Sequence, residues 1–146
     1  MYNVIELSNY IIAEFENRKA PITNLKLQKV LYYIQGYFMK SFGREAFKDE
    51  IYCWTYGPVV PMSYFEYNRN GSDFLYPAFE PAISLLETER NLIEKIIEKC
   101  REIPSSKLVA MTHDEFPWKN ANMGSIIPKQ SIKSFFAIAD PLEIRR

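Results

Sequence analysis

Few side chains in this sequence could carry out chemistry. His113 is the single histidine and begins the run His113-Asp114-Glu115, whose three residues are all of types that bind metals. A protein metal site needs three or four ligands that converge on one ion, which neighbours in a row do not easily do. At the end of a predicted helix, His113 instead suits the negative end of the helix dipole. We expect no bound metal and no cofactor.

A nucleophilic site would need one of the two cysteines close to that histidine. Cys100 falls on the apolar face of a predicted helix, and Cys53 lies in an extended segment without cationic neighbours that would stabilise a thiolate. The five glycines form no phosphate-binding loop, and neither G-x-S-x-G nor H-E-x-x-H occurs. The sequence therefore predicts no catalytic residues and no enzymatic activity.

The charge of the chain is balanced, because 18 basic residues are matched by 18 acidic ones. Binding to nucleic acid depends on phosphate neutralisation by Lys and Arg, so a neutral chain without a basic run argues against this class of partner. The N-terminal stretch is acidic where a secretion signal is basic, and no apolar run has the length of a bilayer. Two isolated cysteines favour free thiols in a reducing compartment. We expect a cytoplasmic protein that does not associate with membranes.

Apolar residues recur every three or four positions along most of the chain, which is the period of an amphipathic helix. The length of 146 residues predicts a single domain over residues 1–146. We predict a mainly α fold, a compact helical bundle of about five or six helices, with at most a short extended or two-stranded element near residues 47–56. Helices are expected at residues 2–17, 24–42, 61–70, 85–103, 106–113 and 129–139.

The most regular apolar positions of these helices define the predicted core. They are Leu27, Val30, Leu31, Ile34, Ile93 and Ile97. A stripe of this kind should face the centre of the domain.

Prolines and glycines punctuate the middle of the chain. Pro61 is expected at the first position of a helix, where its missing N–H costs no hydrogen bond. Gly71 should end that helix, whose inner face is predicted to carry Tyr64, Phe65 and Asn68. Residues 72–84 and 116–128 are expected to be loops.

Two glutamines lie seven residues apart on the second predicted helix, Gln28 and Gln35, with Tyr32 one turn from each. Amides and phenols must find hydrogen-bond partners when they are buried. One interpretation is that these side chains bind backbone groups of the neighbouring corner. The other is that they form a polar strip that recognises a partner.

The corner is the uncharged run from Trp54 to Pro61, which contains two aromatics and two prolines. Such a segment is rigid before any partner arrives, so it loses little entropy on binding. It can be a structural corner between helices, the edge of a partner surface, or both.

Three blocks of sequence carry a resemblance. The first is the Leu-Lys-Leu-Gln-Lys run from Leu25 to Lys29, followed by Leu-Tyr-Tyr and Gln-Gly. The second is the Trp, Tyr and Gly-Pro-Val-Val-Pro of the corner, and the third contains Thr-His and Pro-Trp. In this order, over residues 21–136, they resemble the Panacea domain, also called the SocA-like antitoxin domain. Apart from Trp54, Tyr56 and Trp118, the residues that carry the resemblance include Leu27, Gln28, Tyr32, Tyr33, Gln35, Gly36, Gly57, Pro58, Pro61, Thr112, His113 and Pro117.

The resemblance implies a mostly helical antitoxin that neutralises a protein toxin by direct binding. The toxin gene is usually adjacent, often on a prophage or mobile element, and one relative delivers its toxin to a protease. The resemblance supplies no catalytic residues, and for most of the shared positions we expect structural roles. The alternative is a regulatory or nucleic-acid-binding protein without catalytic activity, and a homo-oligomer is compatible with either.

Aromatic side chains around the corner are the predicted partner surface, because Tyr and Trp are enriched at binding hot spots. The candidates are Tyr52, Trp54, Tyr56 and Trp118, with Lys29 nearby. The competing hypothesis places the partner on the charged face of the helix near residues 87–103.

Overall fold

The computed structural model describes residues 1–144 and is mainly α-helical, as predicted. The elements in chain order are α1 (Val4–Asn17), α2 (Asn24–Phe42), β1 (Tyr52–Trp54), β2 (Gly57–Val59), α3 (Pro61–Tyr67), η1 (Asn68–Asn70), α4 (Glu87–Arg101), α5 (Ser105–Asp114), α6 (Phe116–Lys119) and α7 (Lys129–Ile138). Helix η1 is a short 3₁₀ turn.

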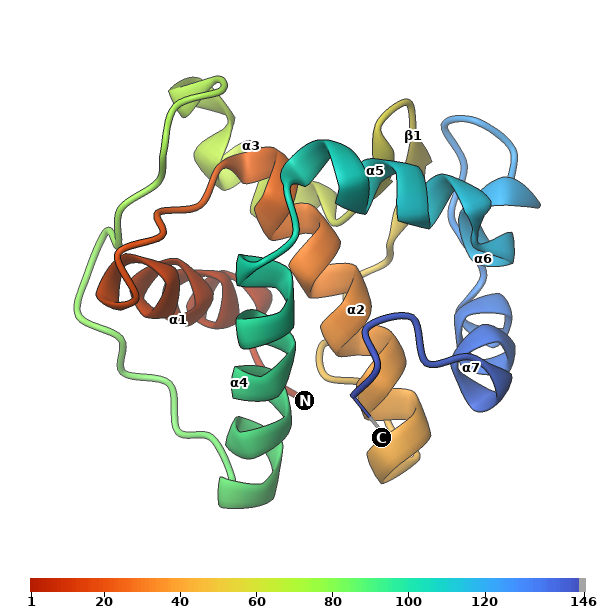
Figure 1. The fold of residues 1–146 in the computed structure, drawn as a ribbon, viewed down its shortest axis with the longest axis horizontal. Helices are drawn as coiled ribbons and strands as arrows, with labels where there is room; N and C mark the ends of the chain where they lie inside the picture. Colours follow the sequence, from red (N-terminus) through yellow and green to blue (C-terminus); the bar gives the residue numbers. More distant parts are fainter. Residues whose placement is uncertain (145–146) are drawn as a thin grey trace.

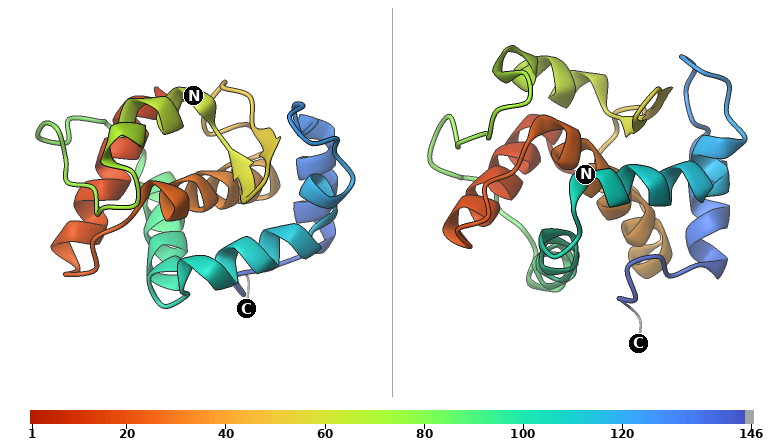
Figure 2. Two further views of the ribbon diagram at one scale, coloured as in Figure 1. Left: turned by 90° about the horizontal axis from the view of Figure 1, so that it is seen from above. Right: turned by 45° about the horizontal axis from the view of Figure 1, so that its top comes forward.

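Helix α2 is the centre of the molecule, and α1, α3, α4, α5, α7 and strand β2 all pack against it (Figures 1 and 2). Its sequence is apolar around most of its circumference, so it is stable only when surrounded. Gly36 allows the closest approach, because a Cβ atom there would lie 2.1 Å from the ring of Phe136 on α7. The glycine is therefore a packing notch for α7.

The ends of α2 agree with the predicted range of residues 24–42. The hydroxyl of Thr23 accepts a hydrogen bond from the amide of Lys26, which makes it the N-cap. Gly43 ends the helix in the left-handed conformation, with φ of 67°. These two residues fix the span of the central helix.

The predicted core is confirmed. Leu27, Val30, Leu31 and Ile34 of α2 are fully buried, as are Ile93 and Ile97 of α4. The two stripes face each other across the packed pair α2 and α4.

The corner folds as an antiparallel hairpin, in which Trp54 pairs with Gly57 and Tyr52 with Val59. The predicted two-stranded element is present, and its second strand, Gly57–Val59, lies just beyond the predicted limit of residue 56. Pro61 is the first residue of α3, as expected, so strand β2 leads into the helix after a single residue.

Two local predictions were wrong. The segment 116–128 is not wholly a loop, because residues Phe116–Lys119 form α6, with Pro117 near its start where the missing N–H is harmless. The inner face of α3 was also assigned wrongly.

The buried residues of α3 are Ser63 and Tyr67, whereas Phe65 is 60 % exposed and Asn68 already belongs to η1. The hydroxyl of Ser63 lies 2.8 Å from that of Ser8 on α1, and this buried polar contact sets which side of α3 faces inward. The hydrophobic pattern alone could not show this orientation, since one of the two buried positions is a serine.

Residues 71–86 contain no helix and run along one edge of the molecule (Figure 1). Leu75 and Leu85 are buried and anchor the segment in the core. The side chain of Asn9 donates to the carbonyl of Phe79 and accepts from the amide of Ala78. The loop is thus fixed to α1 by an amide side chain.

Candidate functional site

A cluster of aromatic side chains, some of them exposed, lies on the hairpin and α3. Trp54 packs edge-on against Tyr64 at 5.2 Å and contacts Phe65 at 5.9 Å between ring centroids. Tyr56 at the hairpin tip is 66 % exposed, and Met62 and Phe65 are each 60 % exposed. We call Trp54, Tyr56, Met62, Tyr64 and Phe65 the hairpin face.

Residues Thr112 to Trp118 contact the hairpin and support it. The indole N–H of Trp118 donates to the carbonyl of Trp54 at 2.8 Å, and the ring of His113 stacks on Trp118 at 3.9 Å. The thiol of Cys53 lies 3.6 Å from the carbonyl of Trp118. The position of Trp54 is therefore determined by a segment that is distant in the sequence.

Helix α2 supports the hairpin through two buried side chains. The carbonyl oxygen of Gln28 accepts from the amide of Val60, while its NH₂ donates to Asn24 and Ser63. The ammonium of Lys29 donates to the carbonyl of Pro58 at 3.2 Å. Both contacts satisfy backbone groups of the hairpin that burial would otherwise leave without partners.

Gly57 is required by this support. Its φ of 120° is a conformation that side chains with a Cβ rarely adopt, and a Cβ there would lie 2.5 Å from Cε of Lys29. The lysine stem thus crosses directly beneath the hairpin.

Gln35 does not bind the corner, contrary to one interpretation of the two glutamines. Its NH₂ donates to the carbonyl of Phe47, and its oxygen accepts from the amides of Ala46 and Phe47. It ties the loop after α2 back onto that helix. The polar strip is therefore split between two backbone segments.

A buried carboxylate forms a second polar centre beside α2. The phenols of Tyr32 and Tyr33 donate to the two oxygens of Glu115, at 2.9 and 2.8 Å. Burial raises the pKa of Glu115 to about 7, although the two phenol hydrogen bonds lower it. Burial and the neighbouring carboxylate raise the pKa of both tyrosines well above their ordinary value. This arrangement locks α2 to the junction of α5 and α6.

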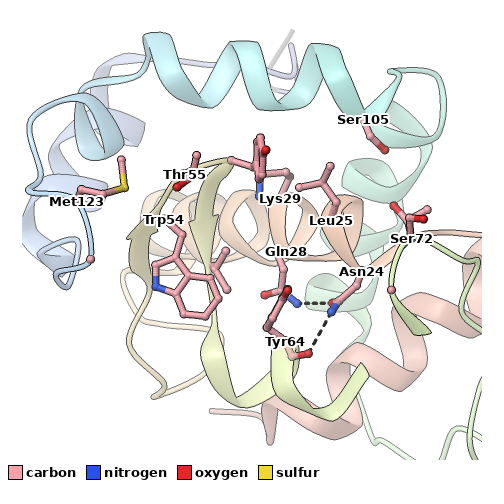
Figure 3. Close-up of a pocket in the computed structure, with 15 residues that line it drawn as sticks. Asn24, Leu25, Gln28, Lys29, Trp54, Thr55, Tyr64, Ser72, Ser105 and Met123 are labelled. Carbon is pink, nitrogen blue, oxygen red and sulfur yellow. Dashed lines mark hydrogen bonds between the residues drawn. The ribbon is translucent and has the colours of Figure 1, made fainter. Parts of the chain in front are cut away.

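A surface pocket of about 680 Å³ opens beside the hairpin face (Figure 3). Residues from α2, the hairpin, α3 and the start of α5 line it. The lining residues include Asn24, Leu25, Lys29, Trp54, Ser105 and Met123.

Within residues 1–144 no three His, Cys, Asp or Glu side chains gather closely enough to hold a metal ion. His113 lies at the end of α5, half-buried on Trp118, and its Nε2 has no hydrogen-bond partner among the described residues. Cys53 and Cys100 are both buried free thiols, and burial raises the pKa of Cys100 to about 12. No nucleophile is brought next to the histidine by these contacts.

The family model for the antitoxin SocA-like Panacea domain matches residues 27–119, which include α2, the hairpin and α5. The chain belongs to this family. Antitoxin SocA of Caulobacter vibrioides (strain NA1000 / CB15N) is 32% identical over 69 residues, covering 47% of this chain and 37% of that protein. The matched part thus spans little more than a third of that relative. No solved structure shows a significant match.

The positions shared with Panacea domains have structural contacts in this chain. Leu27 lies in the core, and Gly36 and Gly57 admit Phe136 and Lys29. Thr112 is buried, and its hydroxyl donates to the carbonyl of Val109.

The predicted partner residues are placed unequally. Tyr56 is exposed at the hairpin tip, whereas Tyr52, Trp54 and Trp118 are half-buried. Lys29 is fully buried and reaches the surface region only as part of the pocket wall. Their role in binding stays a prediction.

Glu115 was not singled out from the sequence as part of a tyrosine pair. Glu115 follows Thr-His-Asp in the sequence. Apart from its place next to a block shared with the family, nothing in the sequence distinguishes it from a solvent-exposed acidic residue. Tyr32 is 83 residues away along the chain, so only the fold reveals the contact.

Proposed function

We propose that this Panacea-family chain is an antitoxin that neutralises a cognate protein toxin by direct binding. The observation that carries the proposal is the family match over residues 27–119. The toxin is expected to be the product of an adjacent gene. No catalytic step is required of the chain itself. Delivery of the bound toxin to a protease is a further part of the proposal, which degradation assays of the complex would test.

The hairpin face is the proposed contact surface. Tyr56, Met62 and Phe65 of this face are large and exposed, Trp54 and Tyr64 beside them are half-buried, and exposed apolar clusters of this kind mark interaction sites. Hydrogen bonds from Gln28, Lys29 and Trp118 hold the hairpin backbone before a partner arrives. A pre-organised surface loses less conformational entropy on binding.

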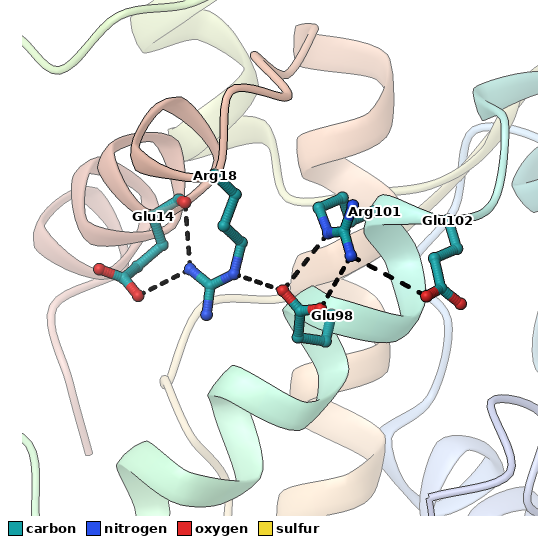
Figure 4. Close-up of polar contacts among 5 residues, drawn as sticks. All are labelled: Glu14, Arg18, Glu98, Arg101 and Glu102. Carbon is teal, nitrogen blue, oxygen red and sulfur yellow. Dashed lines mark hydrogen bonds and ion pairs between the residues drawn. The ribbon is translucent and has the colours of Figure 1, made fainter.

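The competing surface is the charged face of α4. There Glu98 already pairs with Arg18 at 2.7 Å and with Arg101 at 3.0 Å, and Arg18 also binds Glu14 (Figure 4). A partner would have to compete with these intramolecular pairs. Exposed pairs are individually weak, so the competition is modest but opposes binding.

Family membership also predicts what the chain does in a cell. Co-expression with the adjacent gene product should allow growth that this product alone prevents, and the two proteins should purify together. Retention of toxicity on co-expression, with no complex in a pull-down, would contradict the proposed function.

The surface is tested by Tyr56→Ala. Because Tyr56 is mostly exposed, the change should leave the melting temperature nearly unaltered and weaken partner binding by at least about 2 kcal/mol. The double change Glu94→Lys and Glu98→Lys tests α4 in the same assay. Loss of binding only in the α4 variant would move the interface to that helix.

A further inference from the structure

The pocket beside the hairpin face contains a single charged side chain among its described lining residues, that of Lys29. No Asp or Glu contributes to the wall. The other titratable lining residues are Tyr56 and Tyr64. Any electrostatic field from lining side chains inside the pocket is therefore positive.

Lys29 is buried without a carboxylate. Among the described residues its ammonium makes one hydrogen bond, to the carbonyl of Pro58, although an ammonium can donate three. Fully buried charges are normally paired, and burial here lowers the pKa of Lys29 to about 7. Within residues 1–144 no acidic side chain forms an ion pair with Lys29.

Two helix N-termini add to this field. The first turn of α2 contributes Asn24 and Leu25 to the pocket, and α5 begins there with Ser105. Helices α2 and α5 have 19 and 10 residues, and α5 has no side-chain cap on its first amides. Helix N-termini carry partial positive charge and favour anions.

The opposite end of the pocket is apolar. Figure 3 shows Trp54 and Met123 on the side away from Ser105, with Lys29 and Leu25 between them. Volumes of a few hundred Å³ are typical of sites that enclose a ligand, and about 680 Å³ has room for two adjacent side chains. The two ends therefore favour different parts of one ligand.

We propose that this pocket receives a carboxylate side chain of the protein partner, together with an adjoining apolar side chain. The carboxylate lies toward Leu25 and Ser105, and the apolar group lies against Trp54 and Met123. The charge of Lys29 acts through the pocket wall, because buried charges are poorly screened. The inference rests on the proposed function, since it names the chemistry that a toxin would present to this site.

A small probe tests the pocket in the isolated chain. In an NMR titration with up to about 10 mM 3-phenylpropionate, the amides of Leu25, Thr55 and Ser105 should shift, and the neutral 3-phenylpropionamide should bind at least about ten-fold more weakly. Lys29→Met should remove the difference, and Lys26→Met on the same helix should not. Equal binding of acid and amide, or no shifts with either, would overturn the inference.

Proton uptake gives an independent signature. An anion in the pocket raises the pKa of Lys29, so binding at about pH 7.5 should take up protons. Calorimetry in two buffers of different ionisation enthalpy measures this uptake, which Lys29→Met should abolish. Uptake that survives in the variant would assign it to another group and count against the proposal.

Binding of the protein partner to variants of the pocket is a further test. Lys29→Met should lower the affinity of the folded chain for the adjacent gene product at least about ten-fold, and loss of the hydrogen bond to the carbonyl of Pro58 should also cost some stability, so affinity is compared at a temperature where the variant is folded. Leu25→Glu is a second variant at a 37 % exposed position, where a negative charge should repel the carboxylate. Normal affinity in both variants would refute the inference and leave the proposed function intact.

Failure of the wild-type chain to bind that gene product would instead contradict the proposed function. Phenyl phosphate distinguishes the other source of an anion. If it binds about ten-fold more tightly than 3-phenylpropionate, the pocket serves a phosphate ligand and the proposal of a protein carboxylate is wrong.

Discussion

Lys29 and Glu115 are buried ionisable side chains whose pKa values are displaced toward each other. Burial lowers the pKa of Lys29 from 10.5 to about 7 and raises that of Glu115 from 4.5 to about 7. Each shift disfavours the charged form of its group. The two residues should therefore change the free energy of unfolding with pH in opposite directions.

Lys29 affects the pH dependence of the free energy of unfolding above neutral pH. Between about pH 7 and 10.5 the unfolded chain holds a lysine proton that the folded chain has lost, so the free energy of unfolding rises with pH. Denaturant titrations between about pH 7.5 and 8.5, below the titration of Cys100, should show this rise at up to about 1.4 kcal/mol per pH unit. Lys29→Met should flatten it, whereas Lys40→Met should not. An unchanged slope in Lys29→Met would contradict the assignment.

Glu115 affects the pH dependence of the free energy of unfolding below neutral pH, and its contribution has the opposite sign. Between about pH 4.5 and 7 the folded chain holds a carboxyl proton that the unfolded chain has lost, so stability falls as pH rises. Glu115→Gln should remove this fall, and Glu80→Gln, at an exposed position, should not. Chemical denaturation at about pH 5 and 7 measures both variants. A fall that persists in Glu115→Gln would show that another group causes it.

At the scale of elements, the hairpin depends on what lies beneath it. Two strands of three residues each are too short to be stable alone. Their backbone is held by Gln28, Lys29 and Trp118, which come from α2 and α6. The hairpin face is rigid because these helices are.

Gly57→Ala tests that dependence, with Gly43→Ala as the matched control. Both glycines have positive φ, but nothing lies within 4 Å of a Cβ at Gly43, whereas one at Gly57 meets Lys29. The control should lose about 1–2 kcal/mol of stability from backbone strain. Gly57→Ala should lose more, because the lysine must move, and thermal or urea unfolding measures the difference. Equal losses would show that the lysine adapts freely.

At the scale of the whole molecule, the residues that match the family do not include all the residues that form the core. The family match covers residues 27–119, but α1 and α7 lie outside it. Leu7 and Ile11 of α1 and Phe136 of α7 are fully buried against the rest. The core is completed by segments that the family model does not match.

A fragment of residues 27–119 should therefore fail to fold. Removing α1 and α7 exposes large apolar areas of α2 and α4, and burial of such area is the main stabilising contribution in a domain. Circular dichroism should show weak helicity without a cooperative thermal transition, while the full chain melts cooperatively. A sharp transition in the fragment would show that the matched region is self-sufficient.

Long amphipathic helices were the predictable part of this fold. The apolar stripes of α2 and α4 located both helices and their buried residues, because periodicity reports directly on which side is buried. The facing of α3 could not be predicted, since seven residues contain fewer than two full turns of pattern and one of the two buried positions is Ser63. Short helices take their orientation from tertiary contacts.

The candidate site was predictable in its location and not in its interior. Trp54 and Tyr56 marked the hairpin by their type and by the glycine and prolines beside them. The burial of Lys29 and the pocket depend on where α5 begins relative to α2, which no local pattern encodes. Lysine is usually exposed, so its sequence position gave no sign of its buried place.

The notch at Gly36 has a consequence for how the protein is made. Phe136, which fills it, leaves the ribosome 100 residues after the glycine, and the phenol of Tyr37 waits for a partner 103 residues further along the chain. Until Phe136 has been synthesised, the side of α2 that packs against α7 remains uncovered. The packing around α2 is therefore completed only after Phe136 has been synthesised, and a partner that needs this packed surface can bind only after that point.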